Sequence, residues 1–222
     1  MSNNASPELV QLEIADHTER WEALGFAVED SRLEIGGVTI RLGASGRGIT
    51  AWTISRTATG EIDGLPTGTA DDTATVPGPL SAAPAHHPNG AIAVDHVVVV
   101  TPDFDRTAAS LEAAAMPLRR VRTVRGPGED GGFRQGFRRL GPAILELVEA
   151  RDAPPGPARF WGLVIVVDHL DALASRLQQH LSPIKPAVQR GRRIATLRDS
   201  AGLSAKVAFM DPETPEVDRK RA

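Results

Sequence analysis

The chain has no cysteine and no tyrosine, and aromatic residues make up only 4% of its 222 residues. Without cysteine there is no disulfide, no thiolate metal ligand and no cysteine nucleophile, which suits a reducing compartment. The shortage of aromatic rings leaves few platforms on which the bases of single-stranded nucleic acid could stack. A formal net charge of −3 also argues against a polyanion-binding protein. We therefore expect no nucleic-acid partner.

Long hydrophobic runs are missing as well. No apolar stretch approaches the roughly 18 residues that a membrane span needs. The N-terminal sequence MSNNASPELVQLE has neither the basic start nor the apolar stretch of a secretory signal. These absences predict a cytoplasmic protein with no membrane partner. An apolar content of 41% and a charged content of 24% are ordinary for a globular protein.

The most distinctive stretch is AIAVDHVVVVT, residues 91–101, in which one aspartate and one histidine interrupt a run of β-branched residues. Valine and isoleucine at this density, between an Asn-Gly pair and a proline, predict a buried strand. Simple alternation places Val94, His96 and Val98 on one face and Asp95 on the other. A histidine in a buried strand is costly unless its nitrogens are used. His96 is therefore the first candidate functional residue.

The order strand, helix, three strands occurs three times, over residues 9–57, 91–150 and 158–210. Residues 58–90, rich in Thr, Ala, Pro, Gly and Asp, are expected to form a linker loop. Residues 211–222, rich in proline and charge, are expected to form a flexible tail. Since each repeat must bury one face against another, the pattern predicts an α+β fold built of three βαβββ modules.

A repeated βαβββ unit with a histidine in its first strand and Leu-Glu-Leu in its last resembles the vicinal oxygen chelate superfamily. That group includes glyoxalase I, extradiol dioxygenases, and the bleomycin and fosfomycin resistance proteins. The likeness rests on VDHVVV at 94–99, on the helix from Asp105 and on ILEL at 144–147. It implies that residues 91–210 form a glyoxalase-like domain whose two modules curl into a cup.

The resemblance also implies a divalent metal in the cup, held by side chains from the first and last strands of each module. His96 and Glu146 match the ligand positions of the middle module, and imidazole with carboxylate suits Zn, Fe, Mn, Ni or Co. The matching positions of the third module are Gly162 and Ala208, neither of which can ligate through a side chain. Two protein ligands make an incomplete site. Either another residue completes it, or the protein has kept the cup and lost the metal.

The sequence leaves three roles open for His96 and Glu146: metal ligands, an acid–base catalytic pair, or a structural hydrogen bond. Two functions follow. One is a glyoxalase-like enzyme that acts on a small oxygenated molecule through this pair, by a metal- or base-assisted lyase or isomerase reaction. The other is a metal-free protein that binds or sequesters a small molecule, as antibiotic-resistance members of the superfamily do.

Three further side chains are candidates for contact with a small-molecule ligand: Gln135, Trp161 and Arg193. In the strand expected at 133–140, alternation puts Gln135 on one face and Arg134 and Arg138 on the other. Either Gln135 or the two arginines can therefore face the cup. An arginine there would favour an anionic ligand.

Two expectations concern packing. An odd number of modules leaves residues 9–57 without a partner, so this module either packs against the outside of the cup or pairs with its copy in a homodimer. The adjacent His86 and His87 lack a third metal ligand and are expected to be solvent-exposed loop residues.

Overall fold

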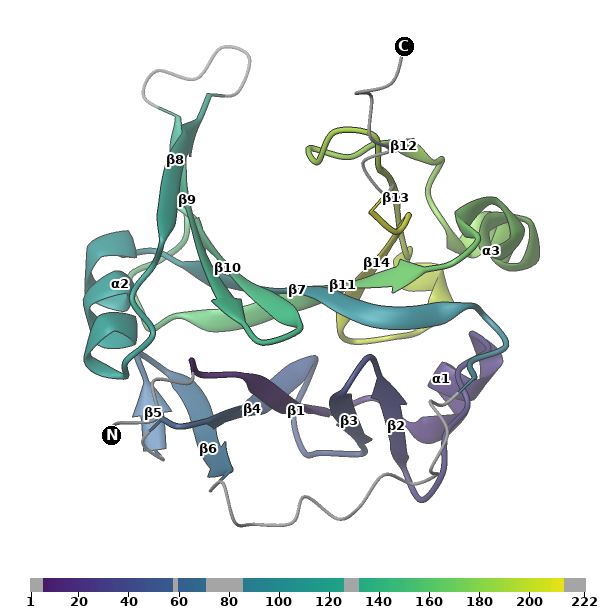
Figure 1. Cartoon of the computed structure of the whole chain (residues 1–222), viewed down its shortest axis with the longest axis horizontal. Coiled ribbons are helices and arrows are strands. Elements are labelled where there is room, and N and C mark those ends of the chain that lie inside the picture. The colour runs from purple at the N-terminus through teal and green to yellow at the C-terminus, as the bar shows by residue number, and fades with distance from the viewer. Residues whose placement is uncertain (1–5, 58–59, 71–85, 126–131, 214–222) are drawn as a thin grey trace, which may run out of the picture.

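The structure is a computed structural model, and it describes residues 6–57, 60–70, 86–125 and 132–213. These residues form two β-sheets with short helices beside them, which confirms the α+β class (Figure 1). Among them, no helix combines the length and the apolar character needed to cross a bilayer.

The larger sheet has eight strands in the order β12-β13-β14-β11-β7-β10-β9-β8. Its elements are β7 (Ala91–Thr101), α2 (Phe104–Ala113), β8 (Arg120–Val124), β9 (Phe133–Leu140), β10 (Ala143–Glu149), β11 (Arg159–Val167), α3 (Leu170–Leu177), the 3-10 helix η1 (Gln178–His180), β12 (Lys185–Pro186), β13 (Arg193–Thr196), the 3-10 helix η2 (Asp199–Ala201) and β14 (Lys206–Met210). In each half the first strand pairs in parallel with the last, and the halves meet at the antiparallel pair β7–β11. This is the paired βαβββ arrangement that the repeats predict.

The smaller sheet has six strands in the order β2-β3-β1-β4-β6-β5. Its elements are β1 (Leu9–Ile14), α1 (Thr18–Ala23), β2 (Arg32–Ile35), β3 (Val38–Leu42), β4 (Ile49–Ser55), β5 (Gly60–Ile62) and β6 (Leu65–Ala70). Two expectations are corrected here. The strand at 49–55 was expected to complete the first module, but β4 pairs antiparallel with β1 and belongs to a second group with β5 and β6. Residues 58–90 were expected to form a linker loop, but β5 and β6 lie within this range and form part of the sheet.

The two sheets share one plan. A central antiparallel pair, β1–β4 or β7–β11, has a parallel partner on each side, and each partner has an antiparallel neighbour beyond it. The smaller sheet lacks only the outermost strand on each side. The first module therefore has a partner within the same chain, in β4–β6, where the sequence pattern predicted an odd number of units.

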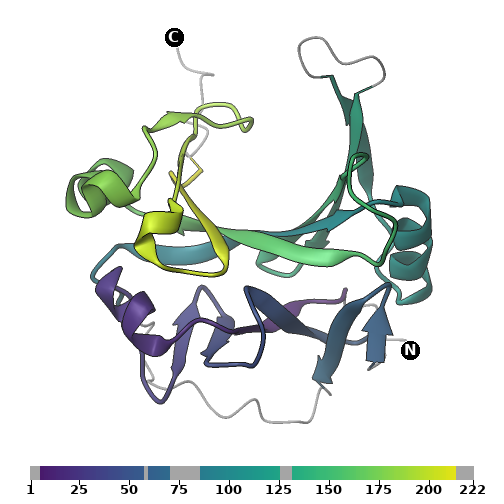
Figure 2. The ribbon, with the colours of Figure 1, turned by 180° about the vertical axis from the view of Figure 1, so that it is seen from behind.

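The six-stranded sheet packs against the convex face of the eight-stranded sheet, and the two views in Figures 1 and 2 agree on this stacking. One hydrophobic core runs between them. Trp52 of β4 meets Phe160 of β11 with ring centroids 5.2 Å apart, and Phe26 lies 6.3 Å from Phe209 of β14. Of the two packings predicted for the first module, the structure has the one against the outside of the cup.

Polar anchors fix this stacking. The carboxylate of Asp16 accepts hydrogen bonds from the backbone N–H groups of Ser204 and Ala205, just before β14. His87 is buried; its Nδ1 accepts from the N–H of Ala27 at 3.1 Å, so Nε2 carries the proton and donates to the carbonyl of Glu34 at 2.9 Å. Burial lowers the pKa of His87. The expectation of an exposed loop residue is wrong for His87 and correct for His86.

Candidate functional site

Strand β7 carries a β-bulge at Asp95. His96 pairs with Val164 on β11, but Val94 already pairs with Ile165, so Asp95 is an extra residue in β7. An extra residue reverses the alternation of side chains. Val94 lies in the core between the sheets, whereas Val164 belongs to a separate apolar cluster on the concave side, the side that His96 shares. The prediction that Val94 and His96 share a face is therefore wrong. Val94 points into the core, His96 lies on the concave face, and Asp95 lies beside His96.

Asp95 links His96 to a buried arginine. One carboxylate oxygen contacts Nδ1 of His96, and the other accepts from Nη1 of Arg192 at 2.7 Å. Nε of Arg192 donates to the backbone carbonyl of Asp211 at 2.7 Å. Burial opposes the charge of Asp95, but the adjacent His96 ring and Arg192 guanidinium outweigh it and lower the pKa of Asp95. A carboxylate at Nδ1 holds the ring proton there, so Nε2 keeps its lone pair free for chemistry.

Glu146 lies on the same face as His96. It stands in register with Val98 of β7, while His96 stands in register with Ile144 of β10, so the two side chains are diagonal neighbours. Burial raises the pKa of Glu146, against the opposing charges that His96 carries when it is protonated and that Arg122 carries. A carboxyl group with a raised pKa beside an imidazole with a free lone pair is the arrangement of an acid with a base.

Gln135 holds the carboxyl group of Glu146. Its Nε2 donates to Oε1 of Glu146 at 2.9 Å, and its own Oε1 accepts from Nε of Arg122 at 2.8 Å. The guanidinium of Arg122 lies over the ring of Phe137, 5.1 Å from its centroid. Gln135 thus belongs to the concave face. Arg122, like Asp95 and Arg192, joins the site although the residue pattern did not single it out.

The arginines that alternate with Gln135 lie on the opposite face. Arg134 donates to Asp105 of α2 at 2.7 Å and to Glu149 at 3.0 Å, and its bonds to Glu149 and Asp105 raise the pKa of Arg134. Arg138 is buried in register with Leu145, a residue of the core between the sheets. The choice between the two sets is therefore settled in favour of Gln135.

Arg193 does not lie on the concave face, which corrects its predicted placement. Its guanidinium pairs with Asp171 of α3 at 2.7 Å and with the side chain of Asp211 at 2.7 Å. The following residue, Ile194, packs on the concave apolar cluster instead. Alternation along β13 thus turns Arg193 outward, and its neighbour Arg192 reaches the site.

Trp161 sits at a second bulge, in β11. Gly162 pairs with Val98 and Phe160 with Val99, so Trp161 is the extra residue. Phe160 enters the core, while Trp161 is 47% exposed. The shift of 66 residues that matches His96 to Gly162 also matches Asp95 to Trp161. The two modules therefore carry a bulge at the same position.

The ligand positions of the third module are closed to metal-binding side chains. Gly162 pairs with Lys206 as His96 pairs with Ile144, which gives both modules the same register. A Cβ atom on Gly162 would lie 2.2 Å from the backbone oxygen of Lys206. Ala208 stands where β10 has its glutamate. Among the described residues, no three His, Cys, Asp or Glu side chains converge as metal ligands would. This donor set does not fit a firmly held divalent metal.

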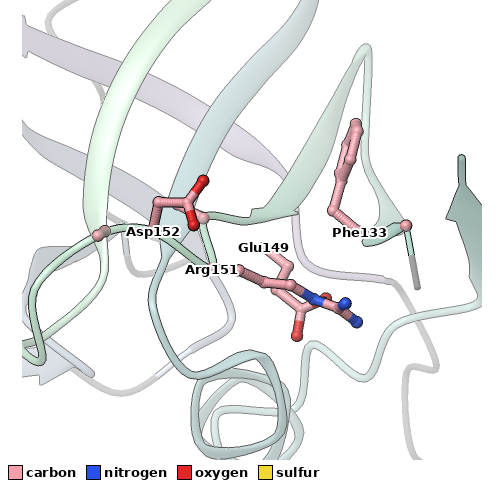
Figure 3. Close-up of a pocket in the computed structure, with 7 residues that line it drawn as sticks. Phe133, Glu149, Arg151 and Asp152 are labelled. Atoms are coloured by element: carbon pink, nitrogen blue, oxygen red, sulfur yellow. The ribbon is translucent and has the colours of Figure 1, made fainter. Parts of the chain in front are cut away.

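A pocket of about 440 Å³ lies elsewhere, at the ends of β9 and β10 (Figure 3). It is lined by Gly132, Phe133, Glu149, Ala150, Arg151, Asp152 and Ala153. Figure 3 shows the guanidinium of Arg151 beside the carboxylate of Glu149, to which it donates at 3.2 Å. Neither His96 nor Glu146 lines this pocket.

No family model and no curated protein matches the sequence. Solved structures do match the fold. A mutant of 4-hydroxymandelate synthase from Streptomyces coelicolor aligns with a TM-score of 0.62 and 14% identity, over 93% of this chain and 92% of that one. Methylmalonyl-CoA epimerase from Mycobacterium tuberculosis aligns with a TM-score of 0.44 and 18% identity, over 61% of this chain and 94% of that one. At such identities the first likeness shows a shared fold, and no more.

Proposed function

We propose that this chain, whose fold is that of the vicinal oxygen chelate superfamily, is an enzyme that moves a proton on a small oxygenated molecule bound against the concave face. His96 is the general base and Glu146 the general acid. The observation that supports this most is the pairing of Asp95 with Nδ1 of His96, because it frees Nε2 beside a carboxyl group of raised pKa.

The reaction class follows from these two groups. Nε2 of His96 accepts a proton from a carbon next to a carbonyl group, and the protonated Glu146 donates its proton to the carbonyl oxygen, which gives an enol. Return of a proton to carbon gives an isomer, and loss of a leaving group gives a lyase reaction. Gln135 orients the carboxyl group, and the exposed ring of Trp161 offers an apolar contact for the substrate. His96 and Glu146 carry out both proton transfers, since the donor set does not fit a metal.

A second candidate function is binding of a small molecule without turnover. It is favoured by the third module, where Gly162 and Ala208 replace the metal-ligating side chains of the superfamily and no other described acid or histidine completes the set. A protein that has kept the curved sheet and lost the metal could act by sequestration, as antibiotic-resistance members do. Both candidates place the ligand on the same face.

Proton exchange in D₂O separates the two candidates. The probes are 2-oxobutyrate, hydroxyacetone and an acetyl thioester, and ¹H NMR follows loss of the C–H signal next to each carbonyl. We expect the wild-type protein to catalyse exchange on at least one probe, and His96→Gln and Glu146→Gln to lower the rate by about 10²–10⁴. An unchanged rate in His96→Gln would exclude the acid–base role. Saturable binding of the probes without exchange would support sequestration.

A further inference from the structure

The hairpin of β8 and β9 is far more basic than the rest of the chain. Residues 118–140 contain one glutamate, one aspartate and the arginines at 119, 120, 122, 125, 134, 138 and 139, in a chain of net charge −3. Within the described residues of this hairpin, Arg134 is the arginine that bonds to carboxylates. Arg122 bonds to the neutral amide of Gln135. The hairpin thus presents a surplus of positive charge.

Three of these arginines belong to the concave face. Pairing of β8, β9 and β10 puts Arg120 in the same row as Glu146. Arg139 stands in the row of His96. Arg122 is two residues from Arg120 on β8 and so shares its face. Arg120 and Arg139 are exposed, and among the described residues neither has an acidic partner. Like charges that share one face of neighbouring strands repel unless an anion lies between them.

The opposite side of the same face is apolar. Val164 of β11 forms a cluster with Ala208 and Met210 of β14, and Ala187 and Ile194 pack against it. His96 lies between the two regions, since it pairs with Val164 on one side and with Ile144 of β10 on the other. A ligand that spans this face therefore meets guanidinium groups at one end and aliphatic side chains at the other.

We propose that the ligand is an organic anion, whose carboxylate or phosphate group is bound by Arg120, Arg122 and Arg139 and whose apolar part lies over Ala187 and Ile194, the partly exposed residues that pack on Val164 and Met210. Guanidinium groups bind both kinds of anion in a bidentate manner, so the structure defines the charge and shape of the ligand rather than its identity. This inference builds on the proposed function, because it assigns a substrate class to the same face.

Calorimetric titration with three small probes tests the proposal. Phenylacetate and phenyl phosphate carry the anion and an apolar ring, while phenylacetamide has the ring without the charge. We expect the wild-type protein to bind at least one of the two anions and not the amide. The double variant Arg120→Gln/Arg139→Gln should weaken that binding at least about tenfold, through lost hydrogen bonds to a charged group. This variant leaves the bonds among Arg122, Gln135 and Glu146 in place.

The matched control is Arg41→Gln/Arg119→Gln, which removes two exposed arginines away from the concave face and changes the net charge equally. An affinity unchanged in the control supports the proposal. Equal weakening in both double variants, equal binding of phenylacetamide, or no saturable binding of either anion would overturn it. His96→Gln separates this proposal from the proposed function, because anion binding should persist in that variant even where proton exchange is lost.

Discussion

The two modules of the eight-stranded sheet follow one plan and carry different chemistry. Each has a bulge in its first strand, at Asp95 in β7 and at Trp161 in β11. After the first bulge comes His96, whose imidazole contacts Asp95. After the second comes Gly162, where the backbone of Lys206 leaves no room for a side chain. The same bulge is thus followed by a histidine in one module and by a glycine without room for a side chain in the other.

This difference divides the concave face into two halves. The β7–β10 half carries His96, Glu146 and the arginines, and the β11–β14 half carries Val164 and its apolar neighbours. A symmetric pair of modules would favour a metal bound by equal contributions from both. An asymmetric pair fits the proposed ligand, which is polar at one end and apolar at the other.

The largest effect on stability is expected from Asp95→Asn, which removes the carboxylate that contacts His96 and pairs with Arg192. Asp95 and Arg192 are 12% and 4% exposed, and loss of one partner from a buried ion pair costs about 3 kcal/mol in the free energy of unfolding. Asp171→Asn is the matched control, because Asp171 pairs with the adjacent Arg193 but is 72% exposed. Denaturant unfolding at neutral pH should show little change in this control. Equal losses in the two variants would contradict the role given to Asp95.

The same variant predicts a pH dependence. The pKa of Asp95 is lower in the folded state than its ordinary value of 3.8, so its contribution is present above pH 3.8 and is lost as the pH falls through the folded value. The stability difference between wild type and Asp95→Asn should therefore shrink below about pH 3.8. A difference that stays constant into stronger acid would show that Asp95 acts without its charge.

Gly162→Ala tests the closed position of the apolar module. Its Cβ would lie 2.2 Å from the oxygen of Lys206, so the backbone must move, and we expect a loss of about 1–3 kcal/mol in the free energy of unfolding. Gly156→Ala is the control, since its Cβ would lie 4.0 Å from the nearest atom. That change should stay within about 0.5 kcal/mol. An unchanged free energy of unfolding in Gly162→Ala would show that this position has room for a side chain.

Trp161→Phe is expected to have the smallest effect. Because Trp161 is 47% exposed, its replacement should alter the free energy of unfolding by less than about 0.5 kcal/mol. Trp21 and Trp52 are buried in the core. Quenching of tryptophan fluorescence by acrylamide should therefore fall strongly in this variant. Quenching that is unchanged would show that Trp161 is buried.

The strand pattern predicted the paired modules well, because an unbroken run of buried β-branched residues such as Val97–Val100 marks a strand that is covered on both faces. The correspondence between the two modules was also predictable. The sequence aligns His96 with Gly162, and in the structure His96 pairs with Ile144 in one module as Gly162 pairs with Lys206 in the other. The bulge at Asp95 was not predictable, because it depends on how β11 pairs with β7. For that reason Asp95 was assigned to the wrong face.

Other errors have the same origin in long-range packing. Strands β5 and β6 fall in a polar, glycine-containing stretch and exist through pairing with β4 rather than through their own propensity. Arg192 and Arg193 are adjacent arginines, and only the pairing of β13 with β14 decides which of them turns toward Asp95. Burial of His87 depends on carbonyl and N–H partners that lie more than 50 residues away.

The most direct test of the acid–base site is a ¹³C NMR titration of the carboxyl groups of Glu146 and Glu149, two glutamates on the same strand. Burial raises the pKa of Glu146. Glu149 is also subject to burial, but hydrogen bonds from Arg134 and Arg151 outweigh it and lower the pKa of Glu149. We expect Glu146 to titrate above the ordinary glutamate value of 4.5 and Glu149 below it. A pKa for Glu146 at or below 4.5 would contradict its role as the acid beside His96.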